Sequence, residues 1–294
     1  MQAIKTDNLT KYYGSKRGIE GVSLEVAEGA VMGFIGPNGA GKSTTIRTFL
    51  GLIRPTVGSA SVLGMDIVKD KTAILSEVGY LPPETAFYSG MRVNELIELS
   101  ARLHKKACSA EAKRLAERLD LDVKRKVNEL SLGNKKKVGI VCALQHRPRL
   151  YVLDEPTSGL DPLIQQQFFE LLSERNADGA TILLSSHILS EVAKNCSHAA
   201  VIREGRLLAS GRLDELAGEG AKQVTLRGVK DASAVERIEN VSAVELNADS
   251  VSFLYGGSAK SLVLALGALE FDGVSIRDQE LDEVFMRYYS NEES

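Results

Sequence analysis

One segment near the N-terminus places the strongest constraint on the fold: Gly36-Pro37-Asn38-Gly39-Ala40-Gly41-Lys42-Ser43-Thr44. It fits the pattern of a glycine, four residues and then Gly-Lys-Ser/Thr, which forms a phosphate-binding loop when it joins a strand to a helix. The apolar residues 31–35 predict a buried strand before it, and residues 45–50 predict a helix after it. The sequence therefore predicts an α/β domain that binds a nucleotide.

The residue types in this loop suit phosphate groups. Glycines let successive backbone N–H groups turn inward, and the helix that follows presents its positive end to the same place. Lys42 would bring a positive charge to the β- and γ-phosphates, and the Ser43 hydroxyl would hold Mg²⁺. The predicted nucleotide ligands are Asn38, Gly39, Ala40, Gly41, Lys42, Ser43 and Thr44. The alternative is an ordinary glycine-rich turn.

Composition limits the classes of function. The chain has 294 residues and a net charge of −3, which gives no reason to expect nucleic acid as a partner. Residues 1–8 hold no long apolar core, and no window reaches the roughly 18 apolar residues of a membrane span. A membrane process would therefore need a second chain. The three cysteines are widely spaced, so we expect reduced thiols.

Two acids follow a second apolar run. Residues 150–153 predict a buried strand that ends in Asp154 and Glu155, at the edge of a parallel sheet where ligands bind. Asp154 is a candidate Mg²⁺ ligand, and Glu155 is a candidate for the group that polarises the attacking water. The alternative is a capped turn. His187 follows another predicted strand at residues 181–185, although a lone histidine is more often structural.

Two further segments, the predicted helix that begins at residues 130–134 and a predicted helical insert before it, lie between the nucleotide loop and the two acids. Residues 130–134 (Leu-Ser-Leu-Gly-Asn) open a predicted helix, with Ser131 or Asn134 as its cap. The lysines at 135–137 that follow are either solvent-facing or attract phosphate. Residues 91–103 and 111–119 predict a helical insert at about 84–130. We expect its charges to face solvent: Lys113, Arg114, Lys124, Arg125 and Lys126.

These motifs together resemble the ATP-binding subunit of ABC transporters over residues 3–217. The matching segments are Walker A at 36–44, the signature at 130–134, Walker B at 150–154 with Glu155, the D-loop at 158–161 with Asp161, and the switch histidine His187. Tyr13 matches the aromatic residue that stacks on adenine. The resemblance implies ATP and Mg²⁺ as cofactors and Lys42, Glu155 and His187 as catalytic residues. It also implies a mixed-sheet core with N-terminal antiparallel strands.

The resemblance further implies the partners. Two ATPase subunits would face each other head to tail, with Ser131 and Gly133 acting in trans on the γ-phosphate. One complete motif set fits a homodimer. A separate transmembrane permease would hold the pair on the cytoplasmic side of the cell membrane.

The sequence departs from the family pattern at two places. Leu132 and Asn134 replace a glycine and a glutamine of the signature, while Ser131 and Gly133 are kept. Pro83 stands where the family has a glutamine that reaches Mg²⁺ and the attacking water. Our hypothesis is that the adjacent Glu84 partly substitutes for that glutamine as a metal ligand.

Residues 218–294 form a predicted second domain, after a linker at 218–220. The expected order of strand, helix, strand, strand, helix, strand suggests a small α+β ferredoxin-like fold. Residues 281–285 resemble the tail of drug- and polyketide-type export ATPases. We expect this domain to steady the dimer or to dock a partner.

The predicted function is that of an ATP-hydrolysing subunit that energises an ABC transporter, an exporter by resemblance. Two alternatives stay open at this stage. One is a soluble ABC ATPase acting on ribosomes or DNA, and the other is a regulatory ATP-binding module with weak turnover. The intact Glu155 and His187 count against the second alternative.

Overall fold

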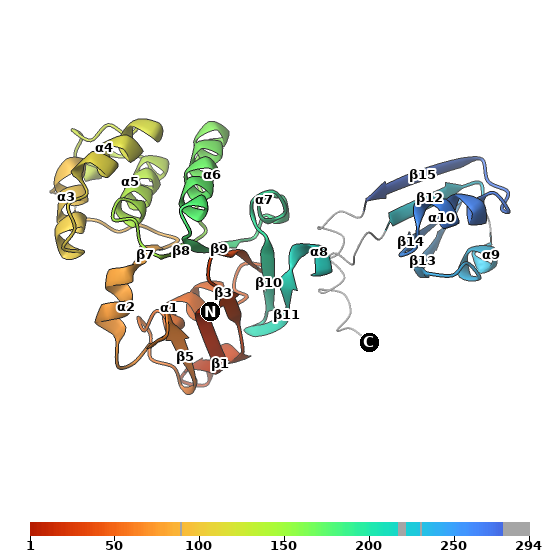
Figure 1. The fold of residues 1–294 in the computed structure, drawn as a ribbon, viewed down its shortest axis with the longest axis horizontal. Helices are drawn as coiled ribbons and strands as arrows, with labels where there is room; N and C mark the ends of the chain where they lie inside the picture. Colours follow the sequence, from red (N-terminus) through yellow and green to blue (C-terminus); the bar gives the residue numbers. More distant parts are fainter. Residues whose placement is uncertain (89, 217–221, 230, 279–294) are drawn as a thin grey trace. The chain divides into compact units, whose positions relative to one another are not determined.

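The computed structural model describes residues 1–88, 90–216, 222–229 and 231–278 (Figure 1). The chain divides into two compact units, Met1–Ser210 and Gly211–Ser294, which we describe separately. The predicted linker at 218–220 and the tail motif at 281–285 lie outside the described residues. The predicted domain boundary after residue 217 therefore stays a prediction.

The N-terminal strands of the first unit form an antiparallel sheet, as predicted. Its order is β2-β1-β5-β6, with β3 paired to β1 beside this path. The bounds are β1 (Gln2–Tyr13), β2 (Lys16–Val22), β3 (Glu25–Ala27), β5 (Val57–Val62) and β6 (Met65–Asp66). Apolar side chains alternate along β1, which is the pattern of a sheet with one buried face.

A second, six-stranded sheet carries the predicted nucleotide loop. Its order is β11-β10-β4-β9-β8-β7, and β10, β4, β9, β8 and β7 run parallel. The bounds are β4 (Val31–Ile35), β7 (Val78–Leu81), β8 (Leu150–Asp154), β9 (Thr181–Ser186), β10 (His198–Arg203) and β11 (Arg206–Arg212). Because parallel strands end at one edge, the residues that follow β4, β7, β8 and β9 converge there.

Helices cover both faces of this sheet. Those of the first unit are α1 (Lys42–Phe49), α2 (Lys71–Glu77), α3 (Val93–Leu103), α4 (Ser109–Arg118), α5 (Leu132–Leu144), α6 (Pro162–Ala177) and α7 (Leu189–Asn195). Figure 1 shows α3, α4, α5 and α6 on one side of β7, β8 and β9. On the other side, Ile46 and Phe49 of α1 join one buried core with residues of both sheets. The sequence analysis did not predict the short helices α2 and α7.

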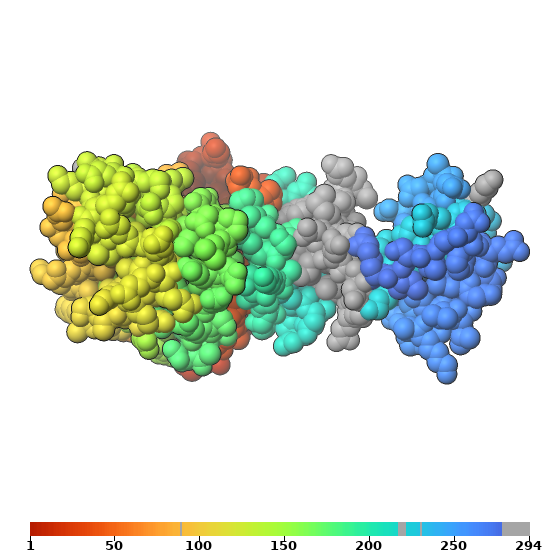
Figure 2. All heavy atoms as spheres, turned by 90° about the horizontal axis from the view of Figure 1, so that it is seen from above, coloured from red at the N-terminus to blue at the C-terminus, as the bar shows by residue number. Residues whose placement is uncertain are grey.

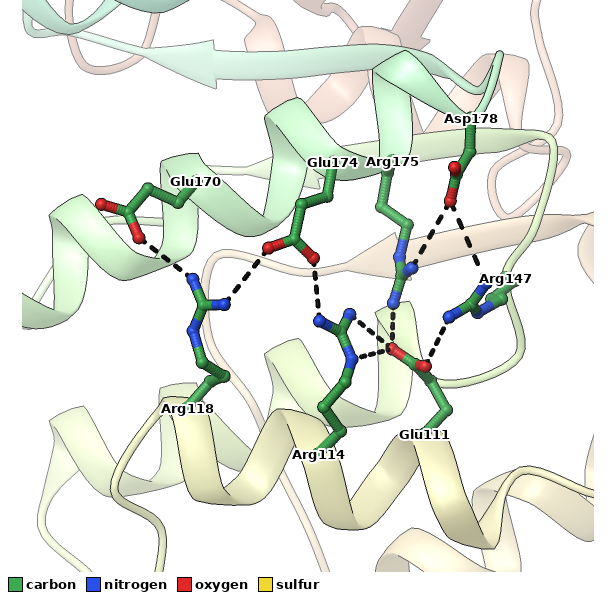
Figure 3. Close-up of polar contacts among 8 residues, drawn as sticks. All are labelled: Glu111, Arg114, Arg118, Arg147, Glu170, Glu174, Arg175 and Asp178. Carbon is green, nitrogen blue, oxygen red and sulfur yellow. Dashed lines mark hydrogen bonds and ion pairs between the residues drawn. The ribbon is translucent and has the colours of Figure 1, made fainter.

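Ion pairs join the helical insert to α6, and this corrects one prediction. Arg114, expected to face solvent, lies 2.8 Å from a carboxylate oxygen of Glu111 and 2.8 Å from one of Glu174. Arg118 bridges Glu170 and Glu174 in the same way. Figure 3 shows these side chains between α4 and α6, and Figure 2 shows the two helices side by side, in yellow and green.

Glu111 is the most enclosed acid of this cluster, and its side chain is 12% exposed. Burial raises its pKa, but hydrogen bonds from Arg114, Arg147 and Arg175 outweigh that effect and lower the pKa to about 2. A carboxylate whose pKa falls on folding stabilises the protein above its unfolded pKa of about 4.5. That stability is lost as the pH falls from there toward 2.

We expect Glu111→Gln to lower the free energy of unfolding by about 3 kcal/mol at pH 7, because three arginines lose their shared carboxylate. Urea denaturation measures this difference, which should shrink as the pH falls below about 4.5. Glu98→Gln is the matched control, since Glu98 pairs with Arg102 in solvent and should cost less than about 1 kcal/mol. Equal losses in the two variants would contradict the account.

The second unit has the predicted ferredoxin-like topology. Its elements are β12 (Lys222–Arg227), α9 (Ser233–Glu236), β13 (Val241–Asn247), β14 (Ser250–Tyr255), α10 (Ala259–Leu266) and β15 (Gly273–Asp278), after the short helix α8 (Leu213–Leu216). All neighbouring strands are antiparallel, in the order β13-β14-β12-β15. Val235 of α9 and Leu262 of α10 pack into one core with Phe253. Helix α9 has only four residues.

Candidate active site

The predicted nucleotide loop lines a cavity of about 560 Å³. Residues 37–44 form one wall, and the lining also includes Tyr13, Lys16, Arg17, Gly18, Pro83 and Glu155. The cavity therefore brings together the loop after β4, the turns after β7 and β8, and the β1–β2 hairpin. Sequence reasoning missed Lys16 and Arg17, which add positive charge beside a phosphate loop.

The conformation of the loop explains its glycines. Gly39 and Gly41 have φ values of +82° and +107°, in the region that favours glycine. A side chain on Gly41 would also place its Cβ 2.9 Å from the Ile19 side chain and 3.1 Å from the Gly18 carbonyl oxygen. Helix α1 begins at Lys42, so its free N–H groups meet the loop. This arrangement is suited to binding an anion.

Lys42 is almost fully enclosed, with its side chain 7% exposed. Its Nζ donates to the Gly36 carbonyl oxygen at 2.5 Å and lies 3.1 Å from Glu155 Oε1. Lys42 lines the cavity, so its charged amine lies beside the space that a phosphate would occupy. The geometry therefore suits the predicted role of Lys42.

Glu155 lies at the centre of the predicted catalytic group. Its carboxylate lies between Lys42 and His187, with Oε2 2.8 Å from His187 Nδ1. Its φ of +49° is uncommon for a residue with a side chain. Its backbone N–H donates to Ser185 Oγ at 2.9 Å, which helps to hold this turn. Such strained backbone persists only where its surroundings hold it, and here the strained residue lines the cavity.

Asp154 fits the predicted metal ligand. It is fully buried, and its Oδ1 accepts a hydrogen bond from Ser185 Oγ at 2.6 Å. Its Oδ2 has no hydrogen-bond partner in the described part of the chain. A buried carboxylate oxygen without a partner is unfavourable, and Mg²⁺ prefers such oxygen ligands. The residues present therefore suit a divalent cation.

Sequence reasoning also missed Ser185, which binds both Asp154 and the backbone of Glu155. The signal was available in outline, because residues 181–185 were predicted to form a buried strand. The register of β8 and β9 pairs Asp154 with Ser185. Only this register shows that the hydroxyl reaches the carboxylate.

The signature residues lie at the start of α5, away from the lining of their own chain's cavity. Ser131 caps the helix by accepting a hydrogen bond from the Asn134 backbone N–H. A Cβ on Gly133 would lie 2.6 Å from the Gly159 carbonyl oxygen, so only glycine fits against the D-loop here. Asp161 caps α6 by accepting from the Ile164 N–H. Leu132, in place of the usual glycine, is 66% exposed.

The prediction for the lysines at 135–137 is wrong for two of them. Lys136 and Lys137 are 3% and 8% exposed. Their amines bind backbone carbonyl oxygens within the chain: Lys136 those of Pro83 and Glu155, and Lys137 that of Asp120. Neither amine faces solvent or a phosphate. Lys136 is buried where α5 packs against β7, and Lys137 where α5 packs against α4, and local sequence reveals neither contact.

Two further predicted residues lie near the cavity. Tyr13 is 48% exposed and lines it, which leaves the ring available to a purine. Pro83 lines the cavity as well, whereas Glu84 is exposed. The role of Glu84 as a metal ligand stays a prediction.

The site is that of a P-loop ATPase. Its phosphate loop, buried acid, strained glutamate and histidine lie at one edge of the sheet. The chain belongs to the ABC transporter family, whose model matches residues 19–158. The bacitracin transport ATP-binding protein BcrA of Bacillus licheniformis is 33% identical, over 97% of this chain and 96% of the relative. The daunorubicin resistance ATP-binding protein DrrA3 of Streptomyces coeruleorubidus is 32% identical, over 97% and 95%.

Solved structures agree with this assignment. The structure of an ATP-binding subunit of an ABC transporter matches with a TM-score of 0.68 and 33% identity, over 73% of this chain and 91% of that chain. The ADP conformation of MJ1267, an ATP-binding cassette of an ABC transporter, matches with a TM-score of 0.61 and 30% identity, over 72% and 91%. The chain is therefore an ATP-binding, ATP-hydrolysing subunit that energises an ABC transporter.

Proposed function

We propose that this ATPase powers an exporter as one of two identical subunits on the cytoplasmic face of a membrane, with Mg²⁺ as cofactor. The main support for the catalytic role is the position of Glu155, which lines the cavity. Its carboxylate lies between Lys42 and His187. Such a carboxylate can accept a proton from an attacking water while the neighbouring cation binds the phosphates.

Each residue has a separate task in this proposal. Residues 38–44 bind the phosphates through backbone N–H groups and the Lys42 amine, and Tyr13 stacks on the base. Entry of the phosphates draws the Lys42 amine away from Glu155, which frees that carboxylate to act on water. His187 holds the same carboxylate from the other side and would contact the γ-phosphate of bound ATP.

Mg²⁺, held by Asp154 and Ser43, would supply positive charge against the β- and γ-phosphate oxygens. The support is the buried Asp154 Oδ2 without a partner and the place of Ser43 in the cavity wall. Ser185 fixes the orientation of Asp154 through its hydrogen bond to Oδ1.

The dimer proposal rests on the signature residues. Ser131 and Gly133 do not line their own chain's cavity, so contacts to a γ-phosphate would have to come from a second subunit. Asp161, at the start of α6 beside the signature, would lie at the same interface. Closure would require ATP, because both subunits would share its γ-phosphate.

The relatives support a role in transport in preference to an ATPase that acts on ribosomes or DNA. BcrA and DrrA3 match nearly their whole lengths and are named for bacitracin transport and daunorubicin resistance. The linearmycin resistance ATP-binding protein LnrL of Bacillus subtilis is 30% identical over 96% of this chain. We therefore expect export of a drug-like compound through a separate permease, and no nucleic acid partner.

The structure is consistent with a separate permease. In the part of the chain that the structure describes, no helix combines the length and apolarity needed to cross a membrane. Expression with an affinity tag in native membranes tests the proposal. We expect an apolar membrane protein to co-purify with the ATPase in detergent. In membrane vesicles that contain both proteins, ATP-dependent export of the compound should stop when the ATPase carries Glu155→Gln. Purification with ribosomes instead would contradict it.

A further inference from the structure

Lys136 lies outside the predicted site, but its side chain contacts the backbone of the turns that hold Pro83 and Glu155. The side chain extends from α5 to the carboxyl ends of two strands and is 3% exposed. Its Nζ donates to the Pro83 carbonyl oxygen at 2.7 Å and to the Glu155 carbonyl oxygen at 3.0 Å. A third carbonyl oxygen, that of Pro82, lies 3.5 Å away. The three donor sites of an ammonium group thus have three backbone acceptors.

These contacts join two turns that the catalytic cycle uses. Pro82 and Pro83 follow β7, and Glu155 follows β8, the parallel neighbour of β7. At position 83 this chain has a proline, which can offer only its carbonyl oxygen as a hydrogen-bonding group. The Lys136 amine binds that oxygen and so ties the Pro83 turn to the Glu155 turn.

The bond to Glu155 completes the support of a strained residue. Glu155 has a positive φ, and its N–H donates to Ser185 Oγ. Lys136 holds its carbonyl oxygen, so both main-chain polar groups of Glu155 are fixed. The direction of a side chain follows from its backbone, and strained backbone persists only where its surroundings hold it. The Ser158 N–H also donates to this oxygen, at 3.4 Å, so removing the amine would leave the peptide that follows Glu155 with the longer of the two bonds.

The charges around the amine agree with this geometry. Burial lowers the pKa of Lys136, while the carboxylates of Asp154, Glu155 and Glu84 raise it. Nearby carboxylates and carbonyl oxygens partly compensate the cost of a buried charge. An apolar side chain of the same length would remove this donor from the carbonyl oxygens of Pro82 and Pro83, and the Glu155 carbonyl oxygen would keep the longer contact from the Ser158 N–H, at 3.4 Å.

We propose that Lys136 is a positioning residue for ATP hydrolysis, which fixes the Glu155 turn and the Pro82–Pro83 turn to the signature helix α5. The proposal rests on the proposed role of Glu155 as the base. Lys136 itself does not line the cavity. Loss of Lys136 should therefore lower kcat and leave the affinity for ATP unchanged, because Lys136 acts by holding Glu155 in position.

The test compares Lys136→Met with Lys137→Met in the full-length chain. Lys137 is the matched control, because it is the next residue of α5 and is also buried. Its amine donates to the Asp120 carbonyl oxygen, at 3.4 Å, away from the turns that follow β7 and β8. Steady-state hydrolysis should show kcat lower by about tenfold to 100-fold for Lys136→Met, with KM for ATP changed less than about threefold. Lys137→Met should keep kcat within about twofold.

Melting temperature and circular dichroism check that each variant is folded. If Lys136→Met does not fold, Lys136→Gln provides the same comparison, because it keeps an N–H donor of shorter reach. Its kcat should be at least about threefold below that of wild type and of Lys137→Met, with KM unchanged. A kcat equal to that of Lys137→Met would overturn the proposal.

A double variant separates this proposal from that for Glu155. In the Glu155→Gln background, adding Lys136→Met should not lower the residual rate further, because residues that act as a unit are not additive. A further loss of about tenfold or more would mean that Lys136 acts independently of Glu155 and would overturn the inference. An unchanged rate in Glu155→Gln alone would instead contradict the proposed function.

Discussion

Glu155→Gln should lower kcat for ATP hydrolysis by at least about 100-fold, the usual scale for loss of a general base. The amide keeps the shape of the side chain but cannot take a proton from water. Its position between Lys42 and His187 should be retained, because the backbone is held by Ser185 and Lys136. A coupled phosphate-release assay measures the rate.

Nucleotide affinity is the internal control for this variant. The amide no longer attracts the Lys42 amine, so we expect ATP to bind at least as tightly as in wild type. Equilibrium binding of a fluorescent ATP analogue measures this affinity. An unchanged rate would show that another group takes the proton, and a lost affinity would show that Glu155 supports the cavity itself.

Lys42→Met should weaken ATP binding by about 100-fold and abolish measurable hydrolysis. A hydrogen bond from a charged donor contributes about 1.5–3 kcal/mol, and here it meets phosphate oxygens inside an enclosed site. The loss also leaves Glu155 without its cation, so its charge would repel the phosphates. Calorimetric titration with ATP under conditions that prevent turnover gives the dissociation constant.

Lys113→Met is the matched control for Lys42→Met. Lys113 lies on α4 with its side chain 78% exposed, and its nearest acid, Glu117, is 3.9 Å away. This variant loses the same charge from the chain, and its affinity should stay within about twofold of wild type. Equal losses in both variants would mean that net charge alone, not the loop, decides the affinity for ATP.

Local signals in the sequence predicted most of the site. The loop at 36–44 sits between a buried strand and a helix as expected, since a motif and an apolar run report on neighbouring residues. The acids at 154–155 and the histidine at 187 also meet at one edge, because the parallel order of the strands brings them there. In the second unit, the predicted order of strand, helix, strand, strand, helix, strand agrees with the elements from β12 to β15.

Contacts between residues distant in sequence could not be predicted. Three consecutive lysines are typical of a solvated surface, yet Lys136 binds residues more than 15 positions away, in the turns that follow β7 and β8. Arg114 was misjudged for the same reason, because its partner Glu174 lies on α6. A buried charge is recognisable only when its acceptors are known, and these acceptors come from tertiary packing.

The most direct test of the central claim is the oligomeric state of Glu155→Gln by light scattering, in ATP and in ADP. We predict a dimer in ATP, a monomer in ADP, and a monomer in ATP when Ser131→Arg is added, because each γ-phosphate would join two subunits. If Glu155→Gln stays monomeric in saturating ATP, or if its dimer fraction is the same in ADP as in ATP, the account is contradicted.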